Sequence, residues 1–460
     1  MLPPAAQADD YSACAGANPG AAIAGCSAII AAAKDTKRNT ALAHFNRGNA
    51  YRLIGDYGSA IADYGKVIDL NPSYSDAYSN RGTVHSDLGD YERAISDYNK
   101  AIDLSPESEI AYFNRGRVHH LRGDHDLAIA DFDKVIGLNP VHVGAYLSRG
   151  TAYYYKGDYD PAIADYDKVI GLDPTHAAAY VNRGILRADM GDLDRAIADF
   201  DKAISLDPMH VDAHFNRGEA YGKKGNYDQA ITGYDKVIGL DPERAIAYFN
   251  RGSAHFQKGN TDQAIADFSK VIALNPDHAV AYANRGILHS YKGDYDRAIA
   301  DLGKSISLEP KYAVAYFNRG NALREIGDYG RAIVDYDRAI NLNPKNAEYL
   351  NSRCWVRALT GTRLDEAQRD CDAALALSDN APYVLDSRGL VGLKRRHFEG
   401  AWADYDAALK AEPGKASYLY GRGIAAIGLG RAAEGAEDLA NAVKLDADVA
   451  KSFAGFGVSP

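Results

Sequence analysis

The stretch AVAYFNRGNALREIGDYGRAIVDYDRAINLNPKN, residues 313–346, decides the fold of this chain. Its centre, Asn318-Arg319-Gly320, returns every 34 residues. Other copies of Asn-Arg-Gly begin at Asn46, Asn80, Asn114, Asn182, Asn216, Asn250 and Asn284, with Ser148-Arg149-Gly150 as a variant. A fixed period of this length is typical of helical hairpins, which bury their apolar faces only by stacking on their neighbours. The sequence therefore predicts an all-α solenoid.

Each period predicts two helices separated by a turn. Tyr316 and Gly320 lie at helical spacing on a first helix, and Gly327 belongs to the turn signal that ends it. Apolar residues within 332–340 form the stripe of a second helix. Pro344 ends that helix, because the residue before a proline disfavours the helical conformation.

A glycine recurs inside each first helix and an alanine recurs on each second helix, as at Gly48 and Ala60. Glycine within a helix costs about 1 kcal/mol relative to alanine, so its repetition needs a structural reason. We expect the two small-residue columns to face each other and let the paired backbones approach closely.

The order Tyr316, Gly320, Leu323, Gly327-Asp328-Tyr329, Ala332, Tyr336, Ala339, Pro344 resembles the tetratricopeptide repeat. The resemblance covers about residues 41–451. It implies a right-handed superhelical solenoid of antiparallel helix hairpins, about twelve repeats plus an N-terminal cap. It also implies a non-enzymatic scaffold whose first helices line a concave groove for a partner peptide or protein.

Five segments are expected along the chain. Residues 1–8 look like the remnant of a signal-peptide cleavage region, and 9–40 like an N-terminal cap with a cysteine pair. Residues 41–346 form nine regular repeats, and 347–451 form three divergent ones. Residues 452–460 are expected to be a loose tail.

The column before the repeated glycine holds arginine, where the tetratricopeptide pattern usually has an apolar residue. An aspartate column on the second helix supplies a partner, as in Arg47 with Asp63 and Arg149 with Asp165, and only Gly233 interrupts it. We expect a structural Arg–Asp ladder, made within a repeat or between neighbours, with charge-assisted hydrogen bonds. In the alternative, both columns are solvated.

The four cysteines form two local pairs, Cys14 with Cys26 and Cys354 with Cys371. A turn signal at 18–20 would bring the first pair together, and the second pair occupies the facing glycine and aromatic columns of one repeat. Four cysteines allow three pairings, and both sites favour the local one. Disulfides indicate an oxidising compartment, whereas four buried thiols remain the alternative.

Ala6-Gln7-Ala8 is similar to the small-residue cleavage site of a secretory signal. Together with the cysteine pairs and the Asn-Arg-Gly repeats, it resembles exported bacterial tetratricopeptide-repeat proteins. We therefore expect an extracytoplasmic location, periplasmic or secreted. The alternatives are a cytosolic adaptor and a regulatory repeat subunit of a separately encoded enzyme.

The face of the first helices opposite the core carries aromatic and polar side chains that suit an extended or helical peptide. Its candidate groove residues are Phe45, Asn49, Phe113, Arg117, Tyr154, Phe215, Phe249, Phe256, Phe317 and Asn321. Any single Phe could instead pack between repeats. The carboxylate clamp of cytosolic chaperone adaptors needs lysine in the Phe45 column, and this chain has none there.

No enzymatic function, cofactor or metal is expected. Phosphate-binding loops, nucleophile elbows and zinc-protease signatures are missing from the sequence. The net charge of −10 and the lack of a basic stripe disfavour nucleic acid, and no apolar run is long enough to span a membrane. Histidines of successive repeats should lie too far apart to share an ion, and a turn should separate His120 from His125.

Overall fold

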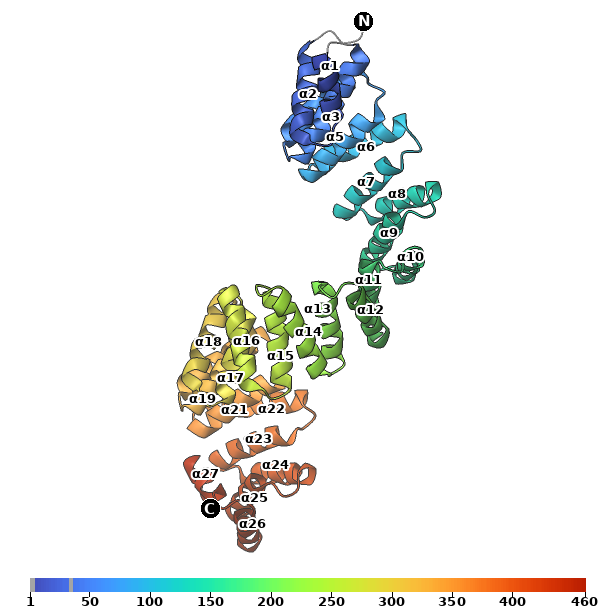
Figure 1. Cartoon of the computed structure of the whole chain (residues 1–460). Helices are drawn as coiled ribbons and strands as arrows, with labels where there is room; N and C mark the ends of the chain where they lie inside the picture. The colour runs from blue at the N-terminus through green and yellow to red at the C-terminus, as the bar shows by residue number, and fades with distance from the viewer. Residues whose placement is uncertain (1–4, 33–35) are drawn as a thin grey trace. The chain divides into compact units, whose positions relative to one another are not determined.

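The computed structural model describes residues 5–32 and 36–460, and within these ranges all regular structure is α-helical (Figure 1). The chain forms two compact units, which meet between Gly225 and Asn226. In each unit, consecutive helices pack side by side as antiparallel pairs. Within each unit, the second helix of a pair also packs on the first helix of the next pair, which is the arrangement of a solenoid.

The first unit contains α1 to α13. Their bounds are Ala5–Cys14, Pro19–Ala32, Lys37–Leu53, Tyr57–Leu70, Ser75–Asp87, Tyr91–Leu104, Glu109–Leu121, His125–Leu138, Val143–Lys156, Tyr159–Leu172, Ala177–Asp189, Leu193–Leu206 and Val211–Lys223. From α3 onward the odd-numbered helices are the first helices of the repeats, and the even-numbered ones are the second helices.

The second unit contains α14 to α27. Their bounds are Tyr227–Leu240, Ala245–Gln257, Thr261–Leu274, Ala279–Tyr291, Tyr295–Leu308, Ala313–Glu325, Tyr329–Leu342, Ala347–Thr360, Leu364–Leu377, Pro382–Lys394, Phe398–Ala411, Ala416–Gly428, Ala432–Leu445 and Val449–Gly455. No helix in the described part of the chain is both long enough and apolar enough to cross a membrane.

Local chemistry sets the helix starts. Asp56 caps α4, because its Oδ1 accepts a hydrogen bond from the backbone N–H of Ser59 at 3.1 Å. Gly55, just before it, has φ +79°, a conformation that glycine adopts without steric cost. In the last repeats Arg396 takes the same place with φ +59°, so this turn is strained.

In most repeats the repeated glycine lies nearest an aromatic ring of the second helix, which modifies the expectation above. The backbone carbonyl of the alanine column also comes within 3.2 Å of a Cβ added at Gly82 or Gly286. A Cβ added at Gly184 would lie 2.6 Å from Phe200 Cε1, and one at Gly48 would lie 2.9 Å from Tyr64 Cε1. Tyr64 and Phe200 are fully buried. The glycine is therefore required because the second-helix ring lies flat against the first-helix backbone.

The two ends of the chain can be compared with the segments expected there. Residues 1–4 lie outside the described residues, and Ala5–Cys14 is helical, so the expected cleavage region is described only in part. The expectation of a loose tail over 452–460 is wrong. Helix α27 extends to Gly455, and Phe453 and Val458 are buried.

Both cysteine pairs lie at disulfide distance. The Sγ atoms of Cys14 and Cys26 are 2.04 Å apart and link α1 to α2. Those of Cys354 and Cys371 are 2.02 Å apart and link α21 to α22. At both sites the pairing is local.

Most ladder arginines contact an aspartate of their own repeat, and many also contact a side chain of the preceding repeat. Arg149 donates from Nε and Nη2 to the two carboxylate oxygens of Asp165 at 2.8 and 2.6 Å. Its Nη1 donates to Asp133 at 2.5 Å. The guanidinium also lies over the ring of Tyr146 at 5.5 Å. The same within-repeat contact joins Arg47–Asp63, Arg81–Asp97, Arg115–Asp131, Arg183–Asp199, Arg251–Asp267, Arg285–Asp301, Arg319–Asp335, Arg353–Asp370, Arg388–Asp404 and Arg422–Asp438.

Burial and the number of hydrogen-bond donors together determine the direction in which the pKa of these aspartates shifts. Burial raises the pKa of Asp165, and the hydrogen bonds from Arg149 offset this only in part. Burial also acts on Asp63, but there His44 Nδ1 lies 2.7 Å from the carboxylate as a further partner. With both Arg47 and His44 present, the pKa of Asp63 falls below its usual value.

Removing the buried aspartate of one pair should destabilise the array. Asp165→Ala leaves the partly buried Arg149 without its bidentate partner, so we expect the free energy of unfolding to fall by about 3 kcal/mol. Asp133→Ala, whose side chain is 52% exposed, is the matched control and should cost less than about 1 kcal/mol. Urea unfolding followed by circular dichroism measures both, and equal losses would contradict a structural role for the buried pair.

Two glycine substitutions should change the free energy of unfolding in opposite directions. Gly184→Ala places a methyl group against Phe200, so the free energy of unfolding should fall by about 1–3 kcal/mol. Gly171→Ala on α10 meets nothing within 4 Å and should raise it by up to about 1 kcal/mol, because alanine favours the helix. Thermal melts of both variants test this, and a stabilised Gly184→Ala would refute the packing of ring on glycine.

Candidate functional site

The face formed by successive first helices is the candidate binding groove. Its floor is built from the second-helix tyrosines, which reach between the first helices. Tyr64 donates its hydroxyl to Asn49 Oδ1 at 2.7 Å, and Asn80 of the next repeat donates to the same oxygen at 2.9 Å. Asn321 accepts in the same way from Tyr336 at 2.8 Å. The amides of Asn49 and Asn321 thus satisfy buried hydroxyls at the groove floor.

These tyrosines remain donors at all physiological pH values. Burial raises the pKa of Tyr98 and of Tyr166 to about 12. Tyr98 donates to Thr83 at 3.2 Å and Tyr166 donates to Thr151 at 3.3 Å. A polar residue two places after the ladder arginine therefore accompanies each of these tyrosines, and this pairing in the sequence is a signal that the sequence analysis missed.

The phenylalanine column packs between repeats more than the sequence analysis expects. Phe215 and Phe317, expected on the groove surface, are buried at 9% and 7% exposure. The ring of Phe317 lies 4.6 Å from that of Tyr349 in the next repeat. The reason is that the residue two places before the ladder arginine points toward the first helix of the next repeat. A ring at this position fills the space between the two helices.

Three further phenylalanines of this column are half-buried in the same joint. Each ring lies close to a ring at the start of the next first helix: Phe45 to Tyr74 at 5.1 Å, Phe113 to His142 at 5.1 Å and Phe249 to His278 at 5.3 Å.

The accessible aromatic residues lie about two turns further along the first helices. Phe256 is 37% exposed and stacks on Tyr291 of the next repeat, 71% exposed, at 5.9 Å between ring centres. Tyr154 is half-buried and donates to Asp189 at 2.6 Å, and its neighbour Tyr155 is 64% exposed. The sequence analysis missed Tyr155 and Tyr291, which stand six residues after a ladder arginine. Arg117 is exposed, as a groove residue should be.

These aromatics border hollows in the groove floor. One hollow of about 180 Å³ lies between α9 and α11, and Thr151, Tyr154, Tyr155, Tyr166, Asn182 and Ile185 line it. An equivalent hollow of about 200 Å³ lies between α15 and α17, and Ser253, Phe256, Gln257, Phe268, Asn284, Ile287 and Leu288 line it. Each has apolar walls with a few polar groups, which is the composition of a site for an apolar side chain.

Two histidines of the repeat ends have a structural role. His142 and His278 cap first helices, because their Nδ1 atoms accept the backbone N–H of Ala145 and Ala281 at 3.0 and 3.1 Å. The expectation that a turn separates His120 from His125 is wrong, since their rings lie 5.1 Å apart. Among the described residues, no three metal-ligating side chains gather around one point.

Models of the tetratricopeptide repeat match the chain along most of its length. The matched residues are 79–143, 216–279 and 387–450 for one model, 48–89, 150–191 and 186–225 for a second, 313–346 for a third and 268–300 for a fourth. No curated protein matches the chain.

Solved structures of repeat proteins also match. A crystal structure of MamA protein is 31% identical, with a TM-score of 0.35, and the match covers 38% of this chain and 94% of MamA. A tetratricopeptide repeat protein from Parabacteroides merdae is 22% identical, with a TM-score of 0.42 and coverage of 54% and 98%. YrrB, described as having an unusual peptide-binding site, is 25% identical, with a TM-score of 0.35 and coverage of 42% and 97%. With helix pairs throughout both units and repeat models matched over more than half of its residues, the chain belongs to the tetratricopeptide repeat family.

Proposed function

We propose that this protein is a non-enzymatic interaction scaffold whose groove binds a short helical segment of a partner protein through aromatic side chains. The observation that carries the proposal is the packing of α27 against the first helices of the last repeats. This helix packs on α25 (Figure 1). The ring of its Phe453 lies 4.9 Å from that of Tyr420, and the ring of Phe456, just after the helix, lies 5.6 Å from that of Trp355 on α21. This packing supports a groove that accepts a helix with aromatic side chains.

The same groove is uncovered further along each unit. Phe256 and Tyr291 on α15 and α17, and Tyr155 on α9, expose large aromatic surfaces beside the two hollows. Rigid aromatic rings around small hollows are typical of binding hot spots. A helix that carries phenylalanine or leucine at i and i+3 or i+4 would place its side chains in such hollows.

We further propose an extracytoplasmic location. It rests on the two cysteine pairs at disulfide distance, because structural disulfides persist outside the reducing cytosol. The cleavage-like Ala6-Gln7-Ala8 is consistent with export. A cytosolic adaptor with reduced cysteines is the competing location.

Removing the exposed groove aromatics should abolish partner capture. The bait is the intact chain beside a Phe256→Ser, Tyr291→Ser variant, with Val334→Ser on α20, 65% exposed, as the control. Pull-downs from envelope and cytosolic fractions should yield a partner that the wild type and the control retain and the double variant loses. Cross-linking from a photoreactive residue at position 256 should then map to a helical, aromatic segment. Equal capture by all three baits would refute groove binding.

Counting free thiols tests the location. We expect no free thiol in protein that is denatured without reduction, because each of the four cysteines lies within bonding distance of another. Reduction should lower the midpoint of thermal unfolding, since each closed loop contributes about 3 kcal/mol in the chain-entropy account. Four free thiols in protein purified from its native source would favour the cytosolic adaptor.

A further inference from the structure

The last repeats form a third cavity, similar in size to the two hollows of the groove but different in the residues that line it. It has a volume of about 210 Å³, equal to roughly seven water molecules at about 30 Å³ each. Its walls come from the first helices α21, α23 and α25, the second helix α24, and α27 with its flanking residues. Trp355, Leu390, Phe453 and Phe456 supply the apolar surface.

Two residues in or near the cavity depart from the repeat. Gly421 stands where other repeats have asparagine or serine before the ladder arginine. A Cβ at Gly421 would lie 2.3 Å from Tyr405 Cζ, so the ring of Tyr405 lies where that side chain would otherwise be. Leu390 stands two places after its arginine, where Asn49, Thr151 or Asn321 accept a tyrosine hydroxyl elsewhere.

Tyr405 is consequently left without its usual partner. Its side chain is 0% exposed, and its hydroxyl has no hydrogen-bond partner within the described residues. A buried hydroxyl without a partner costs about 1–3 kcal/mol, so a ligand that completes its hydrogen bonding gains that interaction.

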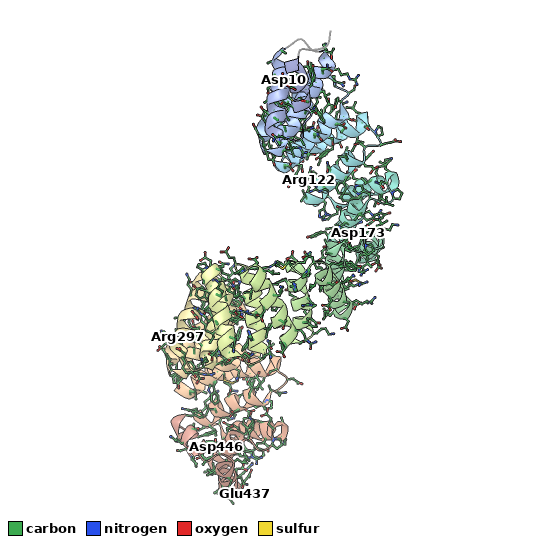
Figure 2. The ribbon with its side chains drawn as sticks, in the orientation of Figure 1. Asp10, Arg122, Asp173, Arg297, Glu437 and Asp446 are labelled. Atoms are coloured by element: carbon green, nitrogen blue, oxygen red, sulfur yellow. A yellow bond between two sulfur atoms is a disulfide. The ribbon has the colours of Figure 1, made fainter. Side chains whose placement is uncertain are left out.

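A carboxylate completes the site. Asp386 stands in the column that holds Phe45, Phe113 or Phe317 in other repeats, and it borders the cavity. Burial raises the pKa of Asp386 to about 7, and the charge of Lys415 opposes this shift. Asp446, which follows α26 and is labelled in Figure 2, adds a second carboxylate to the wall.

We propose that this cavity binds a small organic cation, a primary ammonium group on a short apolar body. The ammonium has three N–H donors, enough for Asp386 and for the hydroxyl oxygen of Tyr405. Aromatic faces of Trp355 and Phe456 attract a cation, and Leu390 and Val449 cover the apolar body. An anionic ligand would place a like charge beside Asp386, and a neutral ligand would form no ion pair with it.

Phenethylamine and its neutral analogue 2-phenylethanol test the proposal. Titration of the full chain, followed by calorimetry and by tryptophan fluorescence, should show saturable binding of the amine, because Trp355 is one of only two tryptophans. The alcohol should bind at least about tenfold more weakly, since it cannot pair with Asp386. Equal affinity for both compounds, or no saturation by the amine at about 10 mM, would overturn the proposal.

Three variants test which residues bind the amine. Asp386→Asn should weaken amine binding at least about tenfold and leave the alcohol unchanged. Leu390→Asn gives Tyr405 the partner found in other repeats and should also weaken binding. Phe256→Ser, which lies outside the cavity, should bind the amine as the wild type does. Circular dichroism checks that each variant folds, and an unaffected Asp386→Asn would refute the assignment.

The dependence on pH provides an independent readout. The cavity faces Asp386, Asp446 and Tyr405, with Lys415 and Tyr418 near the carboxylate. Asp386 ionises as the pH rises through about 7, so affinity for the amine should rise by about tenfold between about pH 6 and 8. This rise should disappear in Asp386→Asn.

A lysine side chain is a second source of the same ammonium group, and Nα-acetyl-lysine methylamide as a further probe distinguishes it from a free amine. If it binds as tightly as phenethylamine, the occupant is a peptide and the free-amine proposal fails.

Discussion

The buried Arg–Asp contact is the interaction on which the rest of this structure depends. Arg149 alone joins Asp165 in its own repeat and Asp133 in the preceding one, while its guanidinium lies over Tyr146. A flat guanidinium can make these contacts at once because its donors point along fixed directions in one plane. Each arginine therefore fixes the angle within a helix pair and also the position of the neighbouring pair. Repetition of this unit lets a regular solenoid form from helices that are only 13 or 14 residues long in most repeats.

This use of arginine limits what the groove can recognise. The ladder binds its arginines to aspartates, so they are not available to pair with a partner's carboxylates. The floor amides, such as Asn49, are already bonded to buried tyrosine hydroxyls. What remains accessible is aromatic surface at Phe256, Tyr291 and Tyr155, placed beside hollows between first helices. Under the proposed function, recognition along this groove would be driven mainly by apolar burial, with its specificity set by the spacing of the rings.

The sequence predicts the helix pairs and their repeat family well, because the 34-residue period places every turn glycine and every ring at a fixed offset. It predicts the side chains of the groove less well. The Phe45 column has the spacing of a surface stripe, yet Phe215 and Phe317 are buried, because periodicity gives the direction of a side chain and not the distance to the next helix. Helix α27 has no repeat pattern, so only the structure shows that Phe453 is buried. The glycine column also has a different partner from the expected one, since a ring can lie over a glycine as closely as a methyl group can.

A repeat protein offers a way to separate function from structure within a single chain, because its own repeats act as the reference. A tyrosine on the second helix, in the repeats of Tyr64, Tyr98, Tyr166 and Tyr336, bonds to a polar residue on the first helix. The repeat of Tyr405 keeps the tyrosine and loses the partner at Leu390, and the tyrosine ring lies where a side chain at position 421 would otherwise be. Tyr405 and Leu390 both line one cavity, and a carboxylate stands there in an otherwise largely apolar column. Convergence of several departures on one cavity is the pattern expected of a site that binds a ligand.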